Sequence, residues 1–169
     1  WLMRRGFYLF TSPDGVHWKR NESVALPFDP DASCEIFWDD QAGVYRTYLR
    51  STRHIESPRT VRRIVYGKTP DVLRPWPFTP IAEPEWHLNN ENPFFVLPKP
   101  NRGQLPLIDT GGQVYRMKGV KYPWAPDTYL AFPWRYIAEG NIRPGSLTMV
   151  SRDGENWSRY EPPYYFASG

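Results

Sequence analysis

Short apolar runs separated by turn residues divide this chain, and two of these runs end in the same heptad. Residues 12–18 read Ser-Pro-Asp-Gly-Val-His-Trp, and residues 151–157 read Ser-Arg-Asp-Gly-Glu-Asn-Trp. Asp-Gly suits a turn with positive φ between two strands, and the following Trp can anchor the return strand. A degenerate third copy at 68–76 keeps Pro-Asp and Trp but lacks Gly, so we expect its turn to be built differently.

Alternating or apolar segments bounded by turn residues predict an edge hairpin followed by two sets of four strands. The expected strands lie at 6–11 and 18–21 for the hairpin, at 33–38, 44–50, 60–67 and around Trp76 for the first set, and at 113–117, 128–134, 146–151 and 157–160 for the second. The segment 33–38 is mostly apolar, and we expect it to be buried on both faces. No helical periodicity persists, so the chain is predicted to be all-β.

Four consecutive antiparallel strands form one blade of a β-propeller, which gives the chain a domain plan. The plan is a single propeller region with an outer edge of a preceding blade at 1–26, one blade at 27–80, a long loop at 81–106 and the next blade at 107–169. The loop is rich in Pro and Asn, with a short strand expected at 94–97. Two blades and an edge do not close a ring, so we expect a fragment of a longer propeller. An open β-sandwich is the alternative.

The composition supports a globular protein and excludes several classes of function. The chain has 169 residues, of which 40% are hydrophobic and 17% aromatic, and it opens without an initiator Met, as a piece of a longer sequence would. A formal charge of +3 is too small to indicate nucleic acid, and no apolar run approaches the ~18 residues of a membrane span. Aromatic side chains at this density pack cores and strands, and they can also stack on sugars.

Metal and disulfide chemistry have no support in the sequence. Cys34 is the single cysteine, so no disulfide can form within the chain, and the compartment stays undecided. The three histidines, His17, His54 and His87, show no metal-ligand spacing with one another. We therefore expect no metal and no cofactor, and the sequence indicates no oligomeric state.

Several blade segments together carry a family resemblance. They are Phe-Trp-Asp at 37–39, Tyr-Arg-Thr-Tyr-Leu-Arg at 45–50, Tyr-Leu-Ala-Phe-Pro at 129–133, and Ser-Arg-Asp-Gly at 151–154 with Trp157. In these segments the chain resembles the five-bladed β-propeller glycosidase-like proteins, which include the invertase and levanase family and the arabinanase and xylosidase family. It is most similar to bacterial relatives labelled as having a glycosyl hydrolase family 32 amino-terminal-like domain. The resemblance implies a carbohydrate partner and favours a secreted or periplasmic protein.

The chemistry that this resemblance implies is hydrolysis of a glycosidic bond by carboxyl groups at the mouth of the central channel. In such propellers the catalytic carboxylates lie on or just before the innermost strands. Asp31 and Asp109 match that placement, and Glu139, or else Glu35, would supply a third carboxyl group. For Asp31 and Asp109 the alternative is a turn-forming role at a strand end.

The remaining candidates would bind substrate. Trp134 and Arg135 end a strand ahead of Glu139, where stacking and hydrogen bonding to a sugar would be useful, although packing between blades is equally consistent. Arg50 belongs to an arginine-rich stretch at 46–63 that could bind an anionic sugar or form a solvated face paired with acids. Glu35 is either a site group or an arginine partner. The invertase-type motifs Asn-Asp-Pro-Asn-Gly, Arg-Asp-Pro and Glu-Cys-Pro are absent, so a non-catalytic glycan-binding or protein-interaction propeller is the alternative function.

Overall fold

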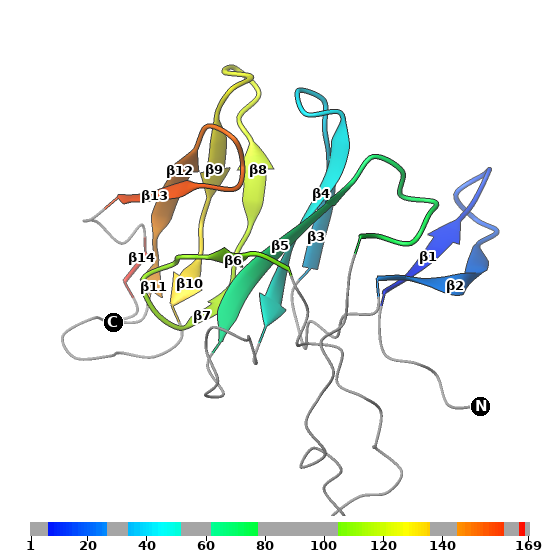
Figure 1. The fold of residues 1–169 in the computed structure, drawn as a ribbon, viewed down its shortest axis with the longest axis horizontal. Coiled ribbons are helices and arrows are strands. Elements are labelled where there is room, and N and C mark those ends of the chain that lie inside the picture. The colour runs from blue at the N-terminus through cyan, green and yellow to red at the C-terminus, as the bar shows by residue number, and fades with distance from the viewer. Residues whose placement is uncertain are drawn as a thin grey trace, which may run out of the picture.

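The structure is a computed structural model that describes residues 7–26, 34–51, 62–77, 105–135, 145–160 and 166–167. Within these ranges all strand pairings are antiparallel and no helix is present, so the predicted all-β class is confirmed (Figure 1). The same ranges accordingly hold no helix able to cross a membrane. The strands in chain order are β1 (Phe7–Thr11), β2 (Lys19–Leu26), β3 (Cys34–Asp39), β4 (Val44–Ser51), β5 (Arg63–Thr69), β6 (Leu107–Ile108), β7 (Val114–Arg116), β8 (Gly119–Lys121), β9 (Tyr129–Ala131), β10 (Trp134–Arg135), β11 (Gly145–Ser146), β12 (Thr148–Ser151), β13 (Trp157–Tyr160) and β14 (Phe166–Ala167).

The predicted edge hairpin is present as a two-stranded sheet of β1 and β2. Its register runs from Phe7 opposite Leu26 to Thr11 opposite Lys19, with two irregularities between them. The return strand continues to Leu26, beyond the expected end at residue 21. A backbone hydrogen bond of 2.6 Å from the N–H of Trp76 to the carbonyl of Ala25 ties this hairpin to the next layer.

The first four-stranded sheet has the order β3-β4-β5-β6. Its fourth strand is not where the sequence predicted it, because the residues around Trp76 form turns and the strand is instead β6, with Leu107 opposite Val65. Trp76 is 5% exposed and packs in the core between this sheet and the β1–β2 hairpin. Its place as a core anchor, directly after a proline that has no N–H to donate, explains the wrong prediction.

The second set of four predicted strands is present, but each of its first three strands is divided in two. One sheet has the order β13-β12-β9-β8 and the other the order β14-β11-β10-β7. Backbone hydrogen bonds of 2.9 Å bridge the two sheets, from the N–H of Phe132 to the carbonyl of Lys118 and from the N–H of Leu147 to the carbonyl of Pro133. Since Pro133 cannot donate to the ladder, the strand that contains it is interrupted there, and the two sheets form one bent unit.

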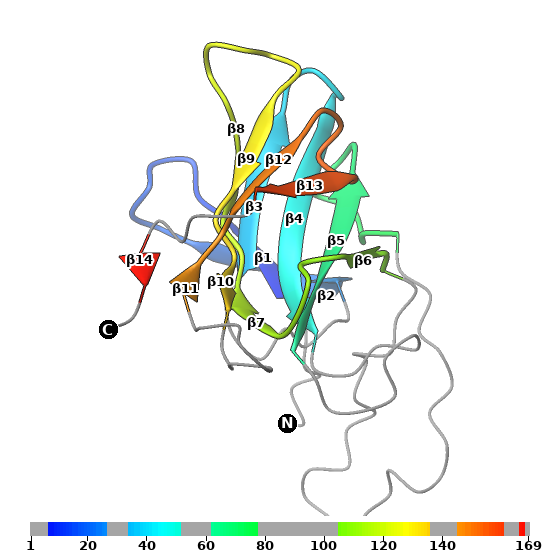
Figure 2. The same cartoon turned by 90° about the vertical axis from the view of Figure 1, so that its left-hand side faces the viewer.

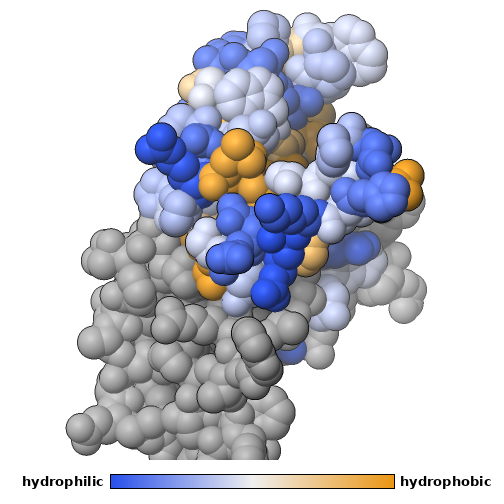
Figure 3. Space-filling model, turned by 90° about the vertical axis from the view of Figure 1, so that its right-hand side faces the viewer, coloured by the Kyte–Doolittle hydropathy of each residue, from blue (hydrophilic) through white to orange (hydrophobic). Residues whose placement is uncertain are grey.

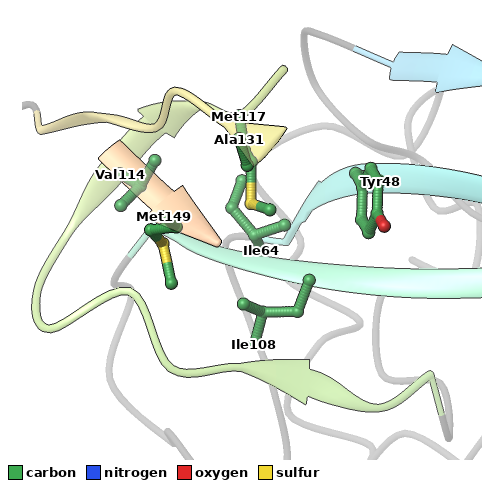
Figure 4. Packing of buried hydrophobic residues seen from close by; sticks show 7 residues of the cluster. All are labelled: Tyr48, Ile64, Ile108, Val114, Met117, Ala131 and Met149. Carbon is green, nitrogen blue, oxygen red and sulfur yellow. The ribbon is translucent and has the colours of Figure 1, made fainter. Parts of the chain in front are cut away.

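Three layers therefore lie side by side: the β1–β2 hairpin, the first sheet, and the bent second unit (Figures 1 and 2). An apolar cluster packs between the first sheet and the second unit, as Figure 4 shows, and a second cluster packs between the first sheet and the hairpin. The first cluster comprises Tyr48, Ile64, Ile108, Val114, Met117, Ala131 and Met149. In the described part of the chain the layers do not close into a ring.

The strand β3 is not buried on both faces as the sequence predicted. Phe37 packs against the core, whereas Ile36 and Trp38 on the other face are 47% and 49% exposed. The reason is that β3 is an edge strand of its sheet, and the hairpin covers only part of its outer face. Figure 3 looks onto the molecule from the hairpin side, where apolar residues form small separate patches among hydrophilic ones.

The two heptads have the same local structure, which confirms the repeated turn. In each, the Ser hydroxyl at position 1 accepts the N–H of the Gly at position 4 at 2.8 Å, and the Asp at position 3 accepts the N–H groups of positions 5 and 6 at 2.7 to 2.9 Å. The indole N–H at position 7 donates to the Gly carbonyl. Both glycines have positive φ, 74° and 72°. The degenerate copy keeps part of this pattern, with Asp71 accepting the N–H of Leu73.

Candidate functional site

Several predicted site residues belong to one end of the sheets, where β3 and β7 begin and β4 and β10 end. We call it the arginine end, defined by Arg50, Arg62 and Arg135, and it lies at the lower side of Figure 1. The opposite end carries the turns at 40–43, 122–128 and 152–156, and we call it the hairpin end. Of the three predicted catalytic carboxyl groups, Asp31 and Glu139 lie outside the described residues.

Asp109 lies at the arginine end, in the connection from β6 to β7. It is exposed, and its Oδ1 accepts the backbone N–H of Gly111 at 2.8 Å. This is an Asx turn, the turn-forming role that the sequence left open for it. Within the described residues its second carboxylate oxygen accepts no hydrogen bond, and the side chain stays accessible to a ligand.

Glu35 lies on β3, directly opposite Tyr48 of β4. Its carboxylate oxygen is 3.0 Å from Nζ of Lys118, which comes from the second unit, and the Glu35 side chain is 25% exposed. This ion pair joins β3 to the residue just before β8. Of the two roles considered for Glu35, the structure has it paired with a cation, although the cation is a lysine and not an arginine.

Arg50 is 3% exposed and spans the interface between the layers. Its Nη1 donates to the carbonyl of Tyr115 at 3.1 Å, and its guanidinium stacks on the Tyr115 ring at 4.6 Å. Two further hydrogen bonds join the two layers near Arg50. The N–H of Val114 donates to the carbonyl of Arg62 at 3.2 Å, and the N–H of Arg62 donates to Oε1 of Gln113 at 3.4 Å. Arg50 is thus not part of a solvated face.

Trp134 and Arg135 form β10, and only the arginine is fully buried. Arg135 is 4% exposed and pairs in register with Val114, while Trp134 is half-buried. A Cβ added to Gly111 would lie 3.2 Å from Nη2 of Arg135, so this guanidinium reaches the turn that Asp109 forms. The structure therefore brings Asp109, Arg50 and Arg135 to the same end of the sheets. Asp109 forms the turn between β6 and β7, and the Arg135 guanidinium reaches that turn.

The sequence did not indicate the strongest electrostatic feature, a buried ion-pair network near the hairpin end. Oδ2 of Asp39 accepts from Arg46 Nη2 at 2.9 Å and from the Tyr129 hydroxyl at 2.7 Å. Glu155 of the second heptad accepts from Tyr66 at 2.8 Å and Lys68 at 2.6 Å, and contacts Arg46 at 3.4 Å. The network joins the first sheet to the second unit, and its two carboxylates balance the charges of its two cations. Its one sequence signal is that Asp39 and Arg46 flank a predicted hairpin turn.

Hydrogen bonding sets the protonation of this network. Burial disfavours the charged form of Asp39, but hydrogen bonds from Tyr129, Arg46 and the backbone N–H of Ala42 outweigh it, so its pKa lies below the ordinary value. Burial is likewise outweighed at Glu155 by Lys68 and Tyr66, and the pKa of Glu155 is lowered. Burial and a carboxylate acceptor raise the pKa of Tyr66 and of Tyr129 to about 12. All four groups are therefore held in their ordinary ionic forms at neutral pH.

This network holds the layers together and does not form a ligand site. Asp39 and Arg46, on the paired strands β3 and β4, are 0% and 2% exposed, and they meet Tyr129 and Glu155 of the second unit across the interface. A separate apolar cavity of about 50 Å³ lies between the β1–β2 hairpin and the first sheet, lined by side chains that include Phe7, Ile36 and Trp76. It holds no carboxyl group and is remote from Asp109. Within the described ranges, no group of three or more His, Cys, Asp or Glu side chains could hold a metal ion.

Comparisons with known proteins add no constraint on this site. No protein-family model, curated protein or solved structure matches the chain.

Proposed function

We propose that the chain is part of a five-bladed β-propeller of the glycosidase-like kind, and that it acts on or binds a carbohydrate at the arginine end. In this proposal the first sheet and the bent second unit are successive blades, and the β1–β2 hairpin is the outer edge of the blade before them. β6 falls within the expected second division, 107–169, but pairs with β5 of the first sheet. A propeller ligand would then bind where the first strands of successive blades begin.

The observation that carries this proposal is the adjacency of the first strands of the two layers. β3 and β8 approach each other, and the ion pair between Glu35 and Lys118 spans them. Such adjacency is what a propeller requires of inner strands. Asp31 and Asp109 precede the predicted first strands of the two layers in the sequence, and Asp109 is exposed at the arginine end, where Nη2 of Arg135 reaches its turn.

Hydrolysis is the leading activity, with one carboxyl group as acid and a second as nucleophile or base. A non-catalytic glycan-binding propeller is the second candidate, and one observation favours it. Asp109 and Glu35 each have a structural partner, the N–H of Gly111 and the ammonium of Lys118. A carboxylate with such a partner can accept a hydrogen bond from a sugar hydroxyl without transferring a proton. Measurements of both binding and turnover are therefore needed to separate the glycan-binding function from hydrolysis.

The test is turnover of a panel of fructan, arabinan and xylan oligosaccharides by the wild type and by Asp31→Asn and Asp109→Asn. Removing a catalytic carboxylate is expected to lower turnover by about a hundredfold to ten-thousandfold. Asp71→Asn is the matched control, because the Asp71 carboxylate also accepts a backbone N–H two residues on and its side chain is 44% exposed, but it lies beyond the opposite end of β5. Circular dichroism verifies that each variant is folded.

The outcomes separate the candidates. Loss of turnover in both site variants, with Asp71→Asn unaffected, supports hydrolysis at the arginine end. Wild-type binding of an oligosaccharide without product release supports the glycan-binding propeller, provided that Asp109→Asn weakens the binding. Turnover that is unchanged in both variants refutes the site.

A further inference from the structure

The turn between β8 and β9, residues 122–128, presents the most exposed tryptophan of the described chain. Trp124 is 81% exposed, and Figure 1 shows its turn projecting at the hairpin end. The other exposed tryptophan of a turn, Trp18, is 61% exposed, and its indole N–H donates to the carbonyl of Gly15. Trp18 is thus explained by the heptad turn. In the part of the chain that the structure describes, the Trp124 indole N–H has no hydrogen-bond acceptor, and the one aromatic ring paired with Trp124 is that of Tyr122.

The turn that carries Trp124 is rigid. Three backbone hydrogen bonds close it: Tyr122 N–H to the Thr128 carbonyl at 2.8 Å, Thr128 N–H to the Ala125 carbonyl at 2.9 Å, and Ala125 N–H to the Tyr122 carbonyl at 3.3 Å. Prolines at 123 and 126 restrict its backbone further. An aromatic ring held in this way loses little conformational entropy when a ligand stacks on it.

Ion pairs anchor the turn on both sides. Before it, Lys121 of β8 pairs with Asp40 of the β3–β4 turn. After it, Nη1 of Arg152 donates to Asp127 at 3.1 Å and to the Thr128 hydroxyl at 2.6 Å. The aromatic pair is therefore bordered by charged hydrogen-bonding groups from two neighbouring turns.

The ring geometry leaves an aromatic face open. The centroids of Tyr122 and Trp124 are 5.3 Å apart and the rings meet at 68°, an edge-to-face contact that covers little of the indole. At 81% exposure at least one face of Trp124 is free for stacking. The surface thus combines a flat aromatic face, a free N–H donor and charged groups at the border.

The charged border distinguishes among ligand classes. The core of a protein–protein interface is depleted of charged residues, whereas this aromatic pair is bordered by the charged side chains of Asp127 and Arg152. A pyranose ring fits it better, because its axial C–H groups form an apolar face that stacks on an aromatic ring while its equatorial hydroxyls hydrogen-bond to charged groups. Furanose rings present no comparably flat C–H face.

We propose that Trp124 and Tyr122, with Asp127 and Arg152 at the border, form a surface binding site for pyranoside chains. The site lies at the hairpin end, away from Asp109, and does not depend on hydrolysis at the arginine end. It would hold a polymeric ligand on the surface of the protein.

The test measures binding of cellohexaose and xylohexaose by titration calorimetry, with an arabinan hexasaccharide as the furanoside comparison. Trp124→Ala is expected to weaken hexaose binding by about tenfold, the size expected when one aromatic stack is lost. Trp18→Ala is the matched control, since it removes an exposed tryptophan of another turn, and it should bind as the wild type does. Asp109→Asn is measured in parallel, so that a sugar held at the arginine end is recognised as such.

The results either support the site or overturn it. Loss of affinity in Trp124→Ala alone supports it, whatever happens to turnover in the arginine-end variants. The site is wrong if Trp124→Ala binds as the wild type does, if Trp18→Ala loses affinity equally, or if the wild type binds neither pyranoside or prefers the furanoside. Loss of binding in Asp109→Asn with Trp124→Ala unaffected would assign the sugar to the arginine end and equally overturn the surface site.

Discussion

Replacing Asp39 by Asn removes the charge that faces the buried guanidinium of Arg46. The two side chains are 0% and 2% exposed, and Oδ2 of Asp39 accepts from Arg46 Nε at 3.2 Å and Nη2 at 2.9 Å and from the Tyr129 hydroxyl at 2.7 Å. Removing one partner of a buried ion pair costs about 3 to 5 kcal/mol. Because Glu155 remains 3.4 Å from Nη1 of Arg46, we expect the lower end, about 3 kcal/mol.

Urea unfolding monitored by tryptophan fluorescence measures this loss, and the neighbouring residue supplies the control. Asp40 also forms an ion pair, with Lys121, but its side chain is 71% exposed. Asp40→Asn should therefore lower the free energy of unfolding by about 0 to 1 kcal/mol. The reasoning is refuted if Asp39→Asn and Asp40→Asn agree within about 0.5 kcal/mol, a usual additivity error.

A second substitution tests whether the loss comes from the unpaired charge. In the double variant Asp39→Asn with Arg46→Met the buried cation is absent, and an apolar side chain fills its place. Well-packed apolar replacements of buried ion pairs are often neutral or stabilising, so the double variant should be more stable than Asp39→Asn alone. A double variant that loses the sum of the two single losses would show that the two side chains do not interact.

Two further predictions concern pH and the heptad turns. Because the folded-state pKa of Asp39 is lowered, the stabilisation from its carboxylate is complete above the unfolded pKa of about 4 and is lost as pH falls toward the folded pKa. Urea midpoints measured at pH 7, 5, 4 and 3 should therefore decrease less steeply with falling pH in Asp39→Asn than in the wild type. Parallel curves for the two proteins would contradict this. Gly154→Ala should destabilise the protein more than Gly15→Ala does, by about 1 to 3 kcal/mol. Both glycines have positive φ, but only a Cβ at position 154 would lie 3.0 Å from the Arg46 guanidinium. Equal unfolding temperatures of the two variants would refute this contact.

The candidate site was predictable only to the extent that strand order alone determines it. Asp109 was predicted as a site residue because it precedes a predicted first strand, and the structure has it at the same end of the sheets as Arg50 and Arg135. The partners of these residues could not be predicted. The bond from Arg50 to the Tyr115 carbonyl joins residues 65 apart, and no local pattern indicates such a pairing.

Local signals also explain which strands were predicted correctly. The pairs β3–β4 and β12–β13 follow from turn residues between alternating segments, and their bounds agree with expectation to within a few residues. β6 is only two residues long and pairs with a strand from which it is separated by the segment 70–106. A pairing of that kind depends on the layers already being packed, so the sequence assigned the fourth strand to the nearer Trp76.

By itself the sequence determined the class of fold and the two heptad turns, because hydrophobic alternation and turn chemistry act over a few residues. The tertiary structure decided which charges are buried and what they face. Glu155 lies in a turn that its own sequence explains, yet its carboxylate contacts Arg46, 109 residues away, across the interface between the layers. Burial and ion pairing depend on which surfaces come together, and only the packed layers bring these residues within reach.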